Sequence, residues 1–211
     1  MIISILGGTG NLGKGLAMRL ALAGYDVIVG SRKKEKAISK AKEYEEICNC
    51  SIRGMSNDDA IDACDVAILT IPWENVLDFV KEHREILSKR IVVSPIVPMR
   101  KEGNKFVYAF ENRSMAEKIA EIVGDNVVSA FQNVPARRFS NLEETPNFDV
   151  IVCGNDYEAK KVVMKIVNSI KNLRALDGGP LSNSRIVESL TPFMINIAML
   201  NRLKELGIQF I

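Results

Sequence analysis

Apolar residues in the first half of the chain follow a pattern typical of buried strands that alternate with helices. Residues 2–6 form a short apolar run, and Leu16, Ala17, Leu20 and Ala21 then recur at helical spacing. The same reading predicts strands near residues 25–30, 51–54, 66–71 and 90–94, and helices near residues 31–47, 57–63 and 74–87. Because strands and helices alternate, we expect an α/β fold with a doubly wound, mostly parallel Rossmann sheet.

The second half continues this alternation, so we expect it to extend the same sheet. The pattern predicts helices at 114–123 and 157–171, and strands at 126–132 and 149–154. We therefore expect a single compact unit in which residues 1–125 are the Rossmann nucleotide-binding region and residues 126–211 are a C-terminal extension.

The last long segment, residues 182–203, predicts an amphipathic helix with Pro192 inside it. Its apolar stripe consists of Ile186, Val187, Leu190, Phe193, Met194, Ile197 and Leu200. Such a stripe packs on a core, and here it can also form a pocket wall or the surface of a homodimer. We expect a homodimer through this final helix.

Charge and hydropathy exclude several classes of partner. The 28 basic and 26 acidic side chains leave a net charge of +2, so no overall field favours nucleic acid or a membrane surface. No apolar run reaches the roughly 18 to 20 residues that cross a bilayer, and no basic leader precedes residue 2. We expect a cytoplasmic protein.

Cysteine and histidine usage argues against metal sites and hydrolases. Cys48, Cys50, Cys64 and Cys153 lack the spacing of a zinc or iron–sulfur site, so no metal is expected. The single histidine, His83, lies in a charged run that predicts a solvated helix face. A hydrolase that needs a histidine base is therefore disfavoured.

A glycine-rich loop carries the first functional signal. Gly8, Gly10 and Gly13 follow the first strand directly and open the first helix, which is the context of a dinucleotide-binding loop. Gly8 makes the tight turn, Gly10 lets the backbone approach a pyrophosphate, and Gly13 allows the helix to pack on the strand. We expect Thr9, Asn11 and Leu12 to contact the ligand, whose phosphates face the helix N-terminus.

The residues after the second strand favour NADP over NAD. An NAD enzyme needs an Asp or Glu there for the ribose hydroxyls, whereas this chain has Ser31 and Arg32. A hydroxyl and a guanidinium both donate to a 2′-phosphate, and Lys36 lies four residues beyond Arg32 on the same helical face. We expect these three residues to hold that phosphate.

Three strand ends should converge on the nicotinamide: residues 70–73, 94–98 and 131–136. They are apolar and rich in proline, and they contain no Lys or His that could move an alcohol proton. Hydride transfer between two ring cofactors requires only their placement and the exclusion of water. The absence of a base in these segments therefore favours transfer between two cofactors, with no catalytic side chain.

The chain as a whole resembles the archaeal F420-dependent NADP reductase family, also called reduced coenzyme F420:NADP oxidoreductases. The segments that carry the resemblance are Leu6–Gly15, Gly30–Arg32, Leu69–Trp73, Val93–Pro95, Val128–Ala130, Gly179–Arg185 and Glu188–Pro192. The resemblance implies an oxidoreductase that transfers hydride reversibly between NADP(H) and the deazaflavin coenzyme F420, with the C-terminal part closing the deazaflavin pocket.

The resemblance also implies roles for individual residues. Residues 9–12, Ser31, Arg32 and Lys36 would bind NADP. The stacked nicotinamide and deazaflavin would be lined by Ile71, Pro72, Trp73, Val97, Val134, Pro135 and Ala136, with Leu206 returning to the pocket from the C-terminus.

One departure from the family lies at Gln132, where some relatives carry a histidine. A glutamine can hydrogen-bond a ring carbonyl but cannot carry charge near neutrality. Arg137 and Arg138 follow closely and could steer the anionic tail of the deazaflavin.

Two other functions stay open at this point. The same nucleotide-binding half suits an NADPH-dependent reductase of a small imine or ketone. It also suits a non-enzymatic NADP-sensing protein whose final helix serves a partner.

Overall fold

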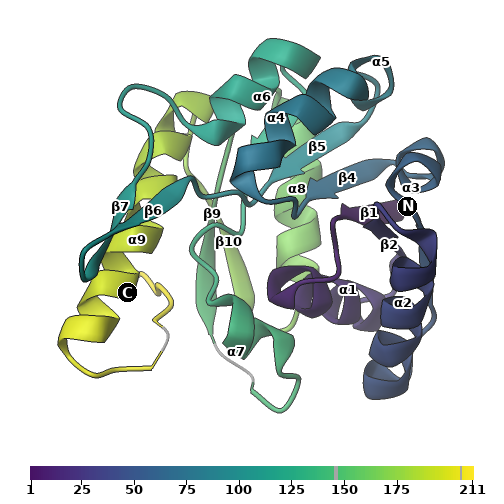
Figure 1. Ribbon diagram of the computed structural model, residues 1–211, viewed down its shortest axis with the longest axis horizontal. Helices are drawn as coiled ribbons and strands as arrows, with labels where there is room; N and C mark the ends of the chain where they lie inside the picture. Colours follow the sequence, from purple (N-terminus) through teal and green to yellow (C-terminus); the bar gives the residue numbers. More distant parts are fainter. Residues whose placement is uncertain (145–146, 205) are drawn as a thin grey trace.

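The chain forms one eight-stranded sheet with the strand order β10-β9-β8-β5-β4-β1-β2-β3 (Figure 1). This computed structural model describes residues 1–144, 147–204 and 206–211. The strands of the sheet are β1 (Ile2–Leu6), β2 (Asp26–Ser31), β3 (Ile52–Ser56), β4 (Val66–Leu69), β5 (Ile91–Ser94), β8 (Val127–Ser129), β9 (Phe148–Gly154) and β10 (Leu173–Asp177). All neighbouring pairs are parallel except β8 and β9. The predicted doubly wound, mostly parallel fold is confirmed.

Helices cover both faces of the sheet, which explains why central strands such as β4 are continuous apolar runs. One face holds α1 (Asn11–Leu22), α2 (Lys34–Cys48), α7 (Ala136–Ser140) and α8 (Tyr157–Ser169), and the other holds α3 (Asn57–Ala63), α4 (Trp73–Glu82), α5 (Arg84–Leu87) and α6 (Met115–Val123). Successive residues of β2 alternate between the two cores, since Val27 and Val29 lie in the first and Ile28 in the second.

The register of the parallel strands brings their carboxyl ends to one edge. Leu6 pairs with Leu69, and Ser94 pairs with Ser129. The loops that follow β1, β4, β5 and β8 therefore open side by side, as ligand-binding loops do in open α/β sheets.

A two-stranded hairpin, β6 (Met99–Glu102) and β7 (Lys105–Tyr108), was not predicted from the sequence. The hairpin follows β5 in the chain, lies outside the main sheet and packs beside α9 (Ser184–Leu200) (Figure 1). A short 3-10 turn, η1 (Leu181–Asn183), precedes α9. Asn196 of α9 fixes it, because its Oδ1 accepts from the Phe106 amide at 2.8 Å and its Nδ2 donates to the Phe106 carbonyl at 2.7 Å.

A buried carboxylate ties α9 to the hairpin and to the start of α6. Glu188 accepts hydrogen bonds from the Tyr108 hydroxyl and from the Met115 and Ala116 amides, at 2.5, 2.9 and 3.2 Å. Burial raises the pKa of Glu188 to about 7, because it removes water from the charged form.

Among the described residues, no helix combines the length and the apolar composition that a membrane-spanning segment needs.

Two further predictions need correction, and two elements were not predicted. The helix expected over 74–87 is interrupted at His83, between α4 and α5. The strand expected over 126–132 ends at Ser129, because the chain turns at Phe131, whose φ of +71° takes it out of the extended conformation. Sequence reasoning also missed α7 and β10.

Candidate functional site

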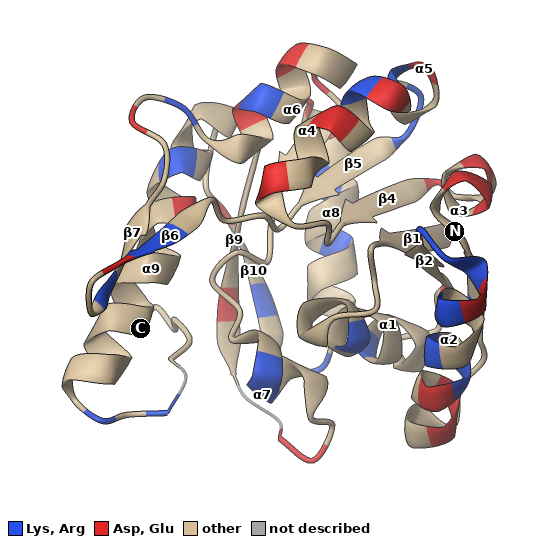
Figure 2. Ribbon diagram, in the orientation of Figure 1, with Lys and Arg blue, Asp and Glu red and all other residues tan. Residues whose placement is uncertain are grey.

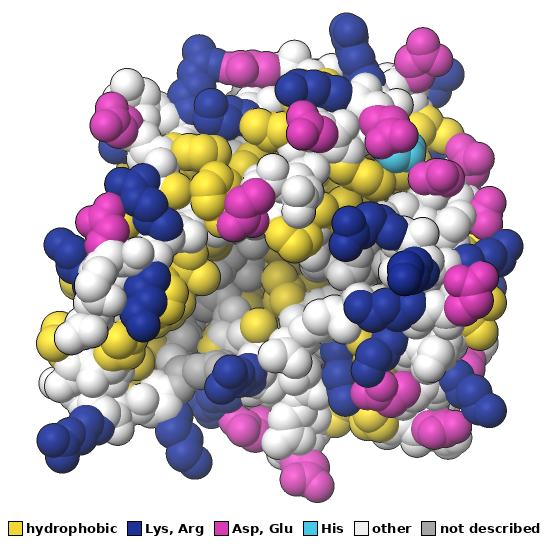
Figure 3. All heavy atoms as spheres, viewed as in Figure 1, with side chains coloured by type: hydrophobic (Ala, Val, Ile, Leu, Met, Phe, Trp, Pro, Cys, Tyr) yellow, Lys and Arg dark blue, Asp and Glu magenta, His cyan; other side chains and the backbone are white. Residues whose placement is uncertain are grey.

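Three adjoining cavities follow the edge where the parallel strands end. The first, about 670 Å³, lies beside Ser31 and Arg32; the second, about 370 Å³, lies beside Trp73. The third, about 660 Å³, lies against α9. The first two share Gly10 and residues 70–72, and the second and third share Pro95, Val97 and Ala136. They form one groove, and Figure 3 shows a hollow with hydrophobic side chains along its walls.

The glycine-rich loop has the geometry that a phosphate-binding loop requires. A Cβ on Gly13 would lie 2.5 Å from the Gly8 Cα, and a Cβ on Gly8 would lie 2.7 Å from the Ile5 carbonyl oxygen. At Gly10, by contrast, a Cβ would meet no described atom within 4 Å. Gly8 and Gly13 are thus needed for packing, whereas Gly10 faces open space at the start of α1, where a pyrophosphate fits.

The polar end of the groove begins where β2 ends. Ser31 is buried there, paired in register with Ser56, and the exposed Arg32 and Lys36 line the same cavity as Thr9. Figure 2 shows Lys and Arg gathered at the start of α2. Exposed cations beside a hydroxyl suit a dianionic phosphate group.

His83 also lines this cavity, and the prediction that it lies on a solvated helix face is wrong. Its ring stacks on Phe79 at 4.3 Å, and its side chain is only 15% exposed. Nδ1 lies 2.9 Å from the Phe79 carbonyl oxygen and Nε2 lies 3.0 Å from Asp58 Oδ1. These contacts hold the ring against the wall, so the far end of the cavity is a flat aromatic surface.

The middle cavity is apolar. Ile71, Pro72 and Trp73 line one side, and Ile96 and Val97 line another. Trp73 is held by an edge-on contact with Phe110, with ring centroids 5.9 Å apart. No ionisable side chain lines this cavity within the part of the chain that the structure describes.

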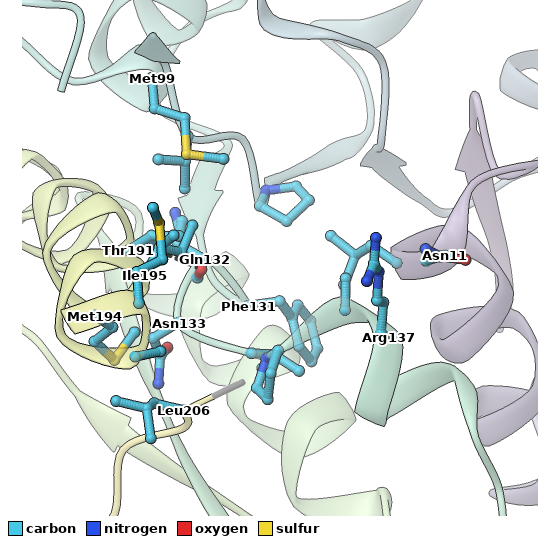
Figure 4. A pocket seen from close by; sticks show the side chains of 18 of the residues that line it. Asn11, Met99, Phe131, Gln132, Asn133, Arg137, Thr191, Met194, Ile195 and Leu206 are labelled. Carbon is cyan, nitrogen blue, oxygen red and sulfur yellow. Dashed lines mark hydrogen bonds between the residues drawn. The ribbon is translucent and has the colours of Figure 1, made fainter. Parts of the chain in front are cut away.

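Four distant segments enclose the third cavity. The loop 131–137 forms its floor, Thr191, Met194 and Ile195 of α9 face that loop, and Met99 and Leu206 add to the rim (Figure 4). Among the described residues that line it, Arg137 is the only ionisable one. The cavity therefore suits a flat, largely apolar ring system.

Gln132 and Asn133 are the polar side chains of the floor. Gln132 Nε2 donates to the Ser94 carbonyl oxygen at 2.8 Å and also contacts Ser129 Oγ, while Asn133 Nδ2 donates to the Asp149 carbonyl oxygen at 2.6 Å. The expectation that Gln132 can hydrogen-bond a ring carbonyl stays a prediction, and in this structure its NH₂ group is engaged by Ser94 and Ser129. Its carbonyl oxygen, an acceptor, is the group left over.

The groove brings together nearly all of the residues predicted from the sequence. Seventeen predicted residues line it: Thr9, Gly10, Asn11, Leu12, Gly13, Ser31, Arg32, Lys36, Ile71, Pro72, Trp73, Val97, Gln132, Val134, Pro135, Ala136 and Leu206. Gly8 does not line it, since it lies beneath the loop against Ile5.

Sequence reasoning named Trp73 at the start of α4 but no later lining residue of that helix and none of the hairpin, and it left α9 as one option for a pocket wall. The residues missed include Ser56, Asn57, Asp58, Asn75, Asp78, Phe79, Glu82, His83, Met99, Thr191, Met194, Ile195, Ala198, Met199 and Leu203. The apolar stripe of α9 was the sequence feature that could have identified its lining residues. Such a stripe predicts which face of a helix is buried, but it does not predict what that face contacts.

Both halves of the groove fit the cofactors that the sequence suggests. Open space at Gly10 and the cations at Arg32 and Lys36 fit a dinucleotide with an extra phosphate. The apolar third cavity fits a second, largely apolar ring system.

Known proteins resemble the chain over its full length. Residues 2–98 match the family model described as NADP oxidoreductase, coenzyme F420-dependent. The F420-dependent NADP reductase of Methanocaldococcus jannaschii is 42% identical, over 99% of this chain and 97% of the relative. The F420-dependent NADP reductase of Methanothermobacter marburgensis is 32% identical over the same shares.

A solved structure shares the fold. A crystal structure from Arthrobacter sp. FB24, provisionally described as an F420-dependent NADP reductase, has a TM-score of 0.84, covers 99% of this chain and 98% of its own, and is 20% identical. At that identity the match supports the fold alone. The two archaeal relatives decide the family: this chain belongs to the F420-dependent NADP reductases.

Proposed function

We propose that the protein transfers a hydride reversibly between NADP(H) and the deazaflavin coenzyme F420. The observation that carries the proposal is the apolar cavity of about 660 Å³ that adjoins the nucleotide groove and shares Pro95, Val97 and Ala136 with it. A protein that bound NADP alone would have no use for a second ring-sized cavity at that place. Membership of the family supports the same function.

The nucleotide side of the groove binds NADP in this proposal. Gly10 and the start of α1 receive the pyrophosphate, with Thr9, Asn11 and Leu12 around it. Ser31, Arg32 and Lys36 hold the 2′-phosphate.

The ring side holds the two reacting rings face to face and keeps water out. Ile71, Pro72, Trp73 and Val97 contact the nicotinamide, and the loop from Gln132 to Ala136 contacts the deazaflavin, which Leu206 covers. When bound, the cofactors supply the chemistry, a hydride passing between C4 of the nicotinamide and C5 of the deazaflavin. The side chains of this wall act by placement, not as acids or bases.

A steady-state assay tests the proposal. The purified protein, given NADPH and oxidised F420, should bleach the visible absorbance of F420 and oxidise an equal amount of NADPH. Turnover of a panel of small imines and ketones without any reaction with F420 would contradict it in favour of a small-substrate reductase. Binding of NADPH without turnover of either acceptor would contradict it in favour of an NADP-sensing protein.

We also propose that two copies associate through α9. Ile186, Phe193 and Leu200 recur every seven residues and are 61%, 60% and 83% exposed, so they form an apolar seam on the outer side of the helix. Light scattering should give a dimer mass for the native protein and a monomer mass for Phe193→Glu. Ile38→Glu, at an exposed apolar position on α2, is the matched control and should stay dimeric. A monomeric native protein would contradict this proposal.

The division of labour between residues 1–125, which bind NADP, and residues 126–211, which complete the deazaflavin pocket, is part of the same proposal. The cytoplasmic location expected from the sequence stays a prediction.

A further inference from the structure

One residue of β9, Asp149, holds the C-terminal segment, residues 206–211, against the main sheet. Its main-chain amide donates to the Ile208 carbonyl oxygen at 2.8 Å, and its carboxylate, which is buried, accepts from the Phe210 amide at 2.5 Å. The two contacts reach positions two residues apart. They therefore fix the segment along β9 as well as against it.

The C-terminal segment lies beside a part of β9 that β8 does not reach. In the described chain, β8 pairs with β9 at Cys153 and Gly154 and not at Asp149. There the main-chain amide is taken by Ile208, and the carbonyl oxygen accepts from Asn133 Nδ2 at 2.6 Å. Because buried main-chain groups need partners, both contacts favour the docked position of the segment.

Arg174 on β10 completes the attachment, and we call Asp149 and Arg174 the anchor pair. The two residues are opposite each other in the register of β9 and β10, where Figure 2 shows an acidic position beside a basic one. Arg174 Nε and Nη2 donate to the two carboxylate oxygens of Asp149, each at 2.7 Å, and Nη2 also donates to the Phe210 carbonyl oxygen at 2.6 Å. The planar fork of a guanidinium suits such a set of acceptors.

The anchor pair is charged at neutral pH. Hydrogen bonds from Arg174 lower the pKa of Asp149, so its carboxylate stays ionised and keeps accepting from the Phe210 amide. Phe210 thus contacts the anchor pair through both its amide and its carbonyl.

The anchored segment reaches the third cavity through Leu206. Leu206 lines that cavity, as does Asn133 on its floor (Figure 4). Next to it in the chain, Gly207 packs so closely on Phe148 that a Cβ would lie 2.0 Å from the ring. Neither residue of the anchor pair lines the cavity itself, so the pair acts on a ligand there only through the segments that it holds.

We propose that Arg174 is a positioning residue for the deazaflavin: through Asp149 it holds the C-terminal segment so that Leu206 closes the third cavity over the bound ring. This inference rests on the proposed function, and it assigns a role to two residues outside the groove. Without the pair, Leu206 spends part of its time away from the cavity, and the affinity for F420 falls by the fraction of closed molecules that is lost. NADP is unaffected, because no described residue of the segment lines the first two cavities.

Hydrogen exchange of the C-terminal peptide, followed by mass spectrometry, tests the anchor without turnover. Arg174→Gln removes both the fork of donors and the charge, so the peptide should exchange about tenfold faster than in the native protein. Arg174→Lys keeps the charge but not the fork, and its exchange should lie between the two. Equal exchange in the native protein and in Arg174→Gln would overturn the inference.

A second ion pair of the same kind supplies the matched control. Arg53 of β3 donates from Nε and Nη2 to the Asp26 carboxylate of β2, at 2.9 to 3.2 Å, at the opposite edge of the sheet. Arg53→Gln therefore removes a similar pair that does not touch the C-terminal segment. Exchange of the C-terminal peptide and use of F420 should stay native in this variant, and the same changes as in Arg174→Gln would overturn the inference.

Steady-state kinetics separate positioning from a structural role. Arg174→Gln should raise the KM for F420 about fivefold, while the KM for NADPH and the kcat at saturating F420 stay within about twofold of native. A structural role would instead lower the fraction of folded enzyme, so kcat would fall with both KM values unchanged. If Arg174→Gln does not fold, Arg174→Lys decides by the same measurements.

Two outcomes distinguish this inference from the proposed function. A native KM for F420 in Arg174→Gln, despite faster exchange, would overturn the inference, while turnover of F420 by the native protein would still support the proposed function. No reduction of F420 by the native protein would contradict the proposed function itself, and the inference with it.

Discussion

The two ends of the groove recognise their ligands in different ways. The phosphate-binding features of the nucleotide end come from one stretch of chain, residues 7–36, which supplies open backbone at Gly10 and exposed cations at Arg32 and Lys36, while residues within 56–58 and 70–83 line the rest of that cavity. The ring end is built from the loop 131–137, α9, the hairpin and the C-terminal residues, and its lining is apolar. Phosphate can be bound by a short local motif, whereas a flat ring needs walls on several sides.

The comparison also concerns stability. At the nucleotide end, Gly8 and Gly13 are needed for packing, whereas Gly10 faces open space. Substitutions there can therefore change ligand binding and protein stability independently. At the ring end the same side chains that line the cavity also tie distant segments together, as Thr191 does with Gln132. Changes there should affect the deazaflavin more than NADP.

The largest effect is expected at Gly10. Gly10→Ala should raise the dissociation constant of NADPH by about a hundredfold, roughly 3 kcal/mol, because a methyl group would occupy the space of the pyrophosphate. Its melting temperature should stay unchanged, since Gly10 has an extended backbone and a Cβ meets no described atom within 4 Å. Gly13→Ala is the contrasting control and should lose stability. Equal destabilisation of both variants would break the distinction between packing and binding glycines.

Glu188 should make the ring end sensitive to pH. Its folded-state pKa is raised from 4.5 to about 7, so the stabilisation from its protonated form is complete below pH 4.5 and is lost as the pH rises towards 7. The free energy of unfolding should therefore fall over this range by about 2 to 3 kcal/mol more in the native protein than in Glu188→Gln. Denaturant titrations across this range test it, and parallel curves for the two proteins would exclude the effect.

Arg32 should distinguish NADPH from NADH. Arg32→Ala should raise the Michaelis constant for NADPH by about tenfold or more, which corresponds to the loss of one charge-assisted hydrogen bond. The Michaelis constant for NADH should stay nearly the same. Lys33→Ala removes a neighbouring exposed charge that does not line the cavity, and serves as the control. Unchanged use of NADPH by Arg32→Ala would remove the assignment of the 2′-phosphate.

The C-terminal residues should affect only the ring end. Gly207 lies against Phe148, where a Cβ would approach the ring to 2.0 Å, so Gly207→Val should push Leu206 away from the cavity. We expect the dissociation constant of F420 to rise about fivefold while that of NADPH stays the same. Gln209→Ala, an exposed position of the same segment, should have no effect. A matching loss of NADPH affinity would show that the two ends are not independent.

The nucleotide end could be predicted from the sequence because its signals are local. Strand, glycine loop and helix follow one another within residues 2–22, and the Ser31–Arg32 pair directly follows the second strand. Each of these residues is explained by one local physical requirement, such as a tight turn or a donor for a phosphate group. The fold class could be predicted for the same reason, since central strands such as β4 and β5 are short apolar runs between helices.

The ring end was predicted only in part, because its contacts join segments far apart in the chain. The hairpin was missed since β6 is almost wholly polar, although Gly103 and Asn104 mark its turn. His83 was misplaced because its partner, Asp58, lies 25 residues away. The orphaned oxygen of Gln132 depends on where the Ser94 carbonyl lies, which no local pattern can give.

Direct passage of the hydride between the two rings is the central claim, and an isotope label tests it most directly. NADPH carrying deuterium on the transferred face of C4 is reacted with oxidised F420 in ordinary water, and the reduced deazaflavin is analysed by mass spectrometry. The account predicts that the label appears in the reduced deazaflavin and that none is found in the solvent. Recovery of the label in water, or reduced F420 without label, would contradict it.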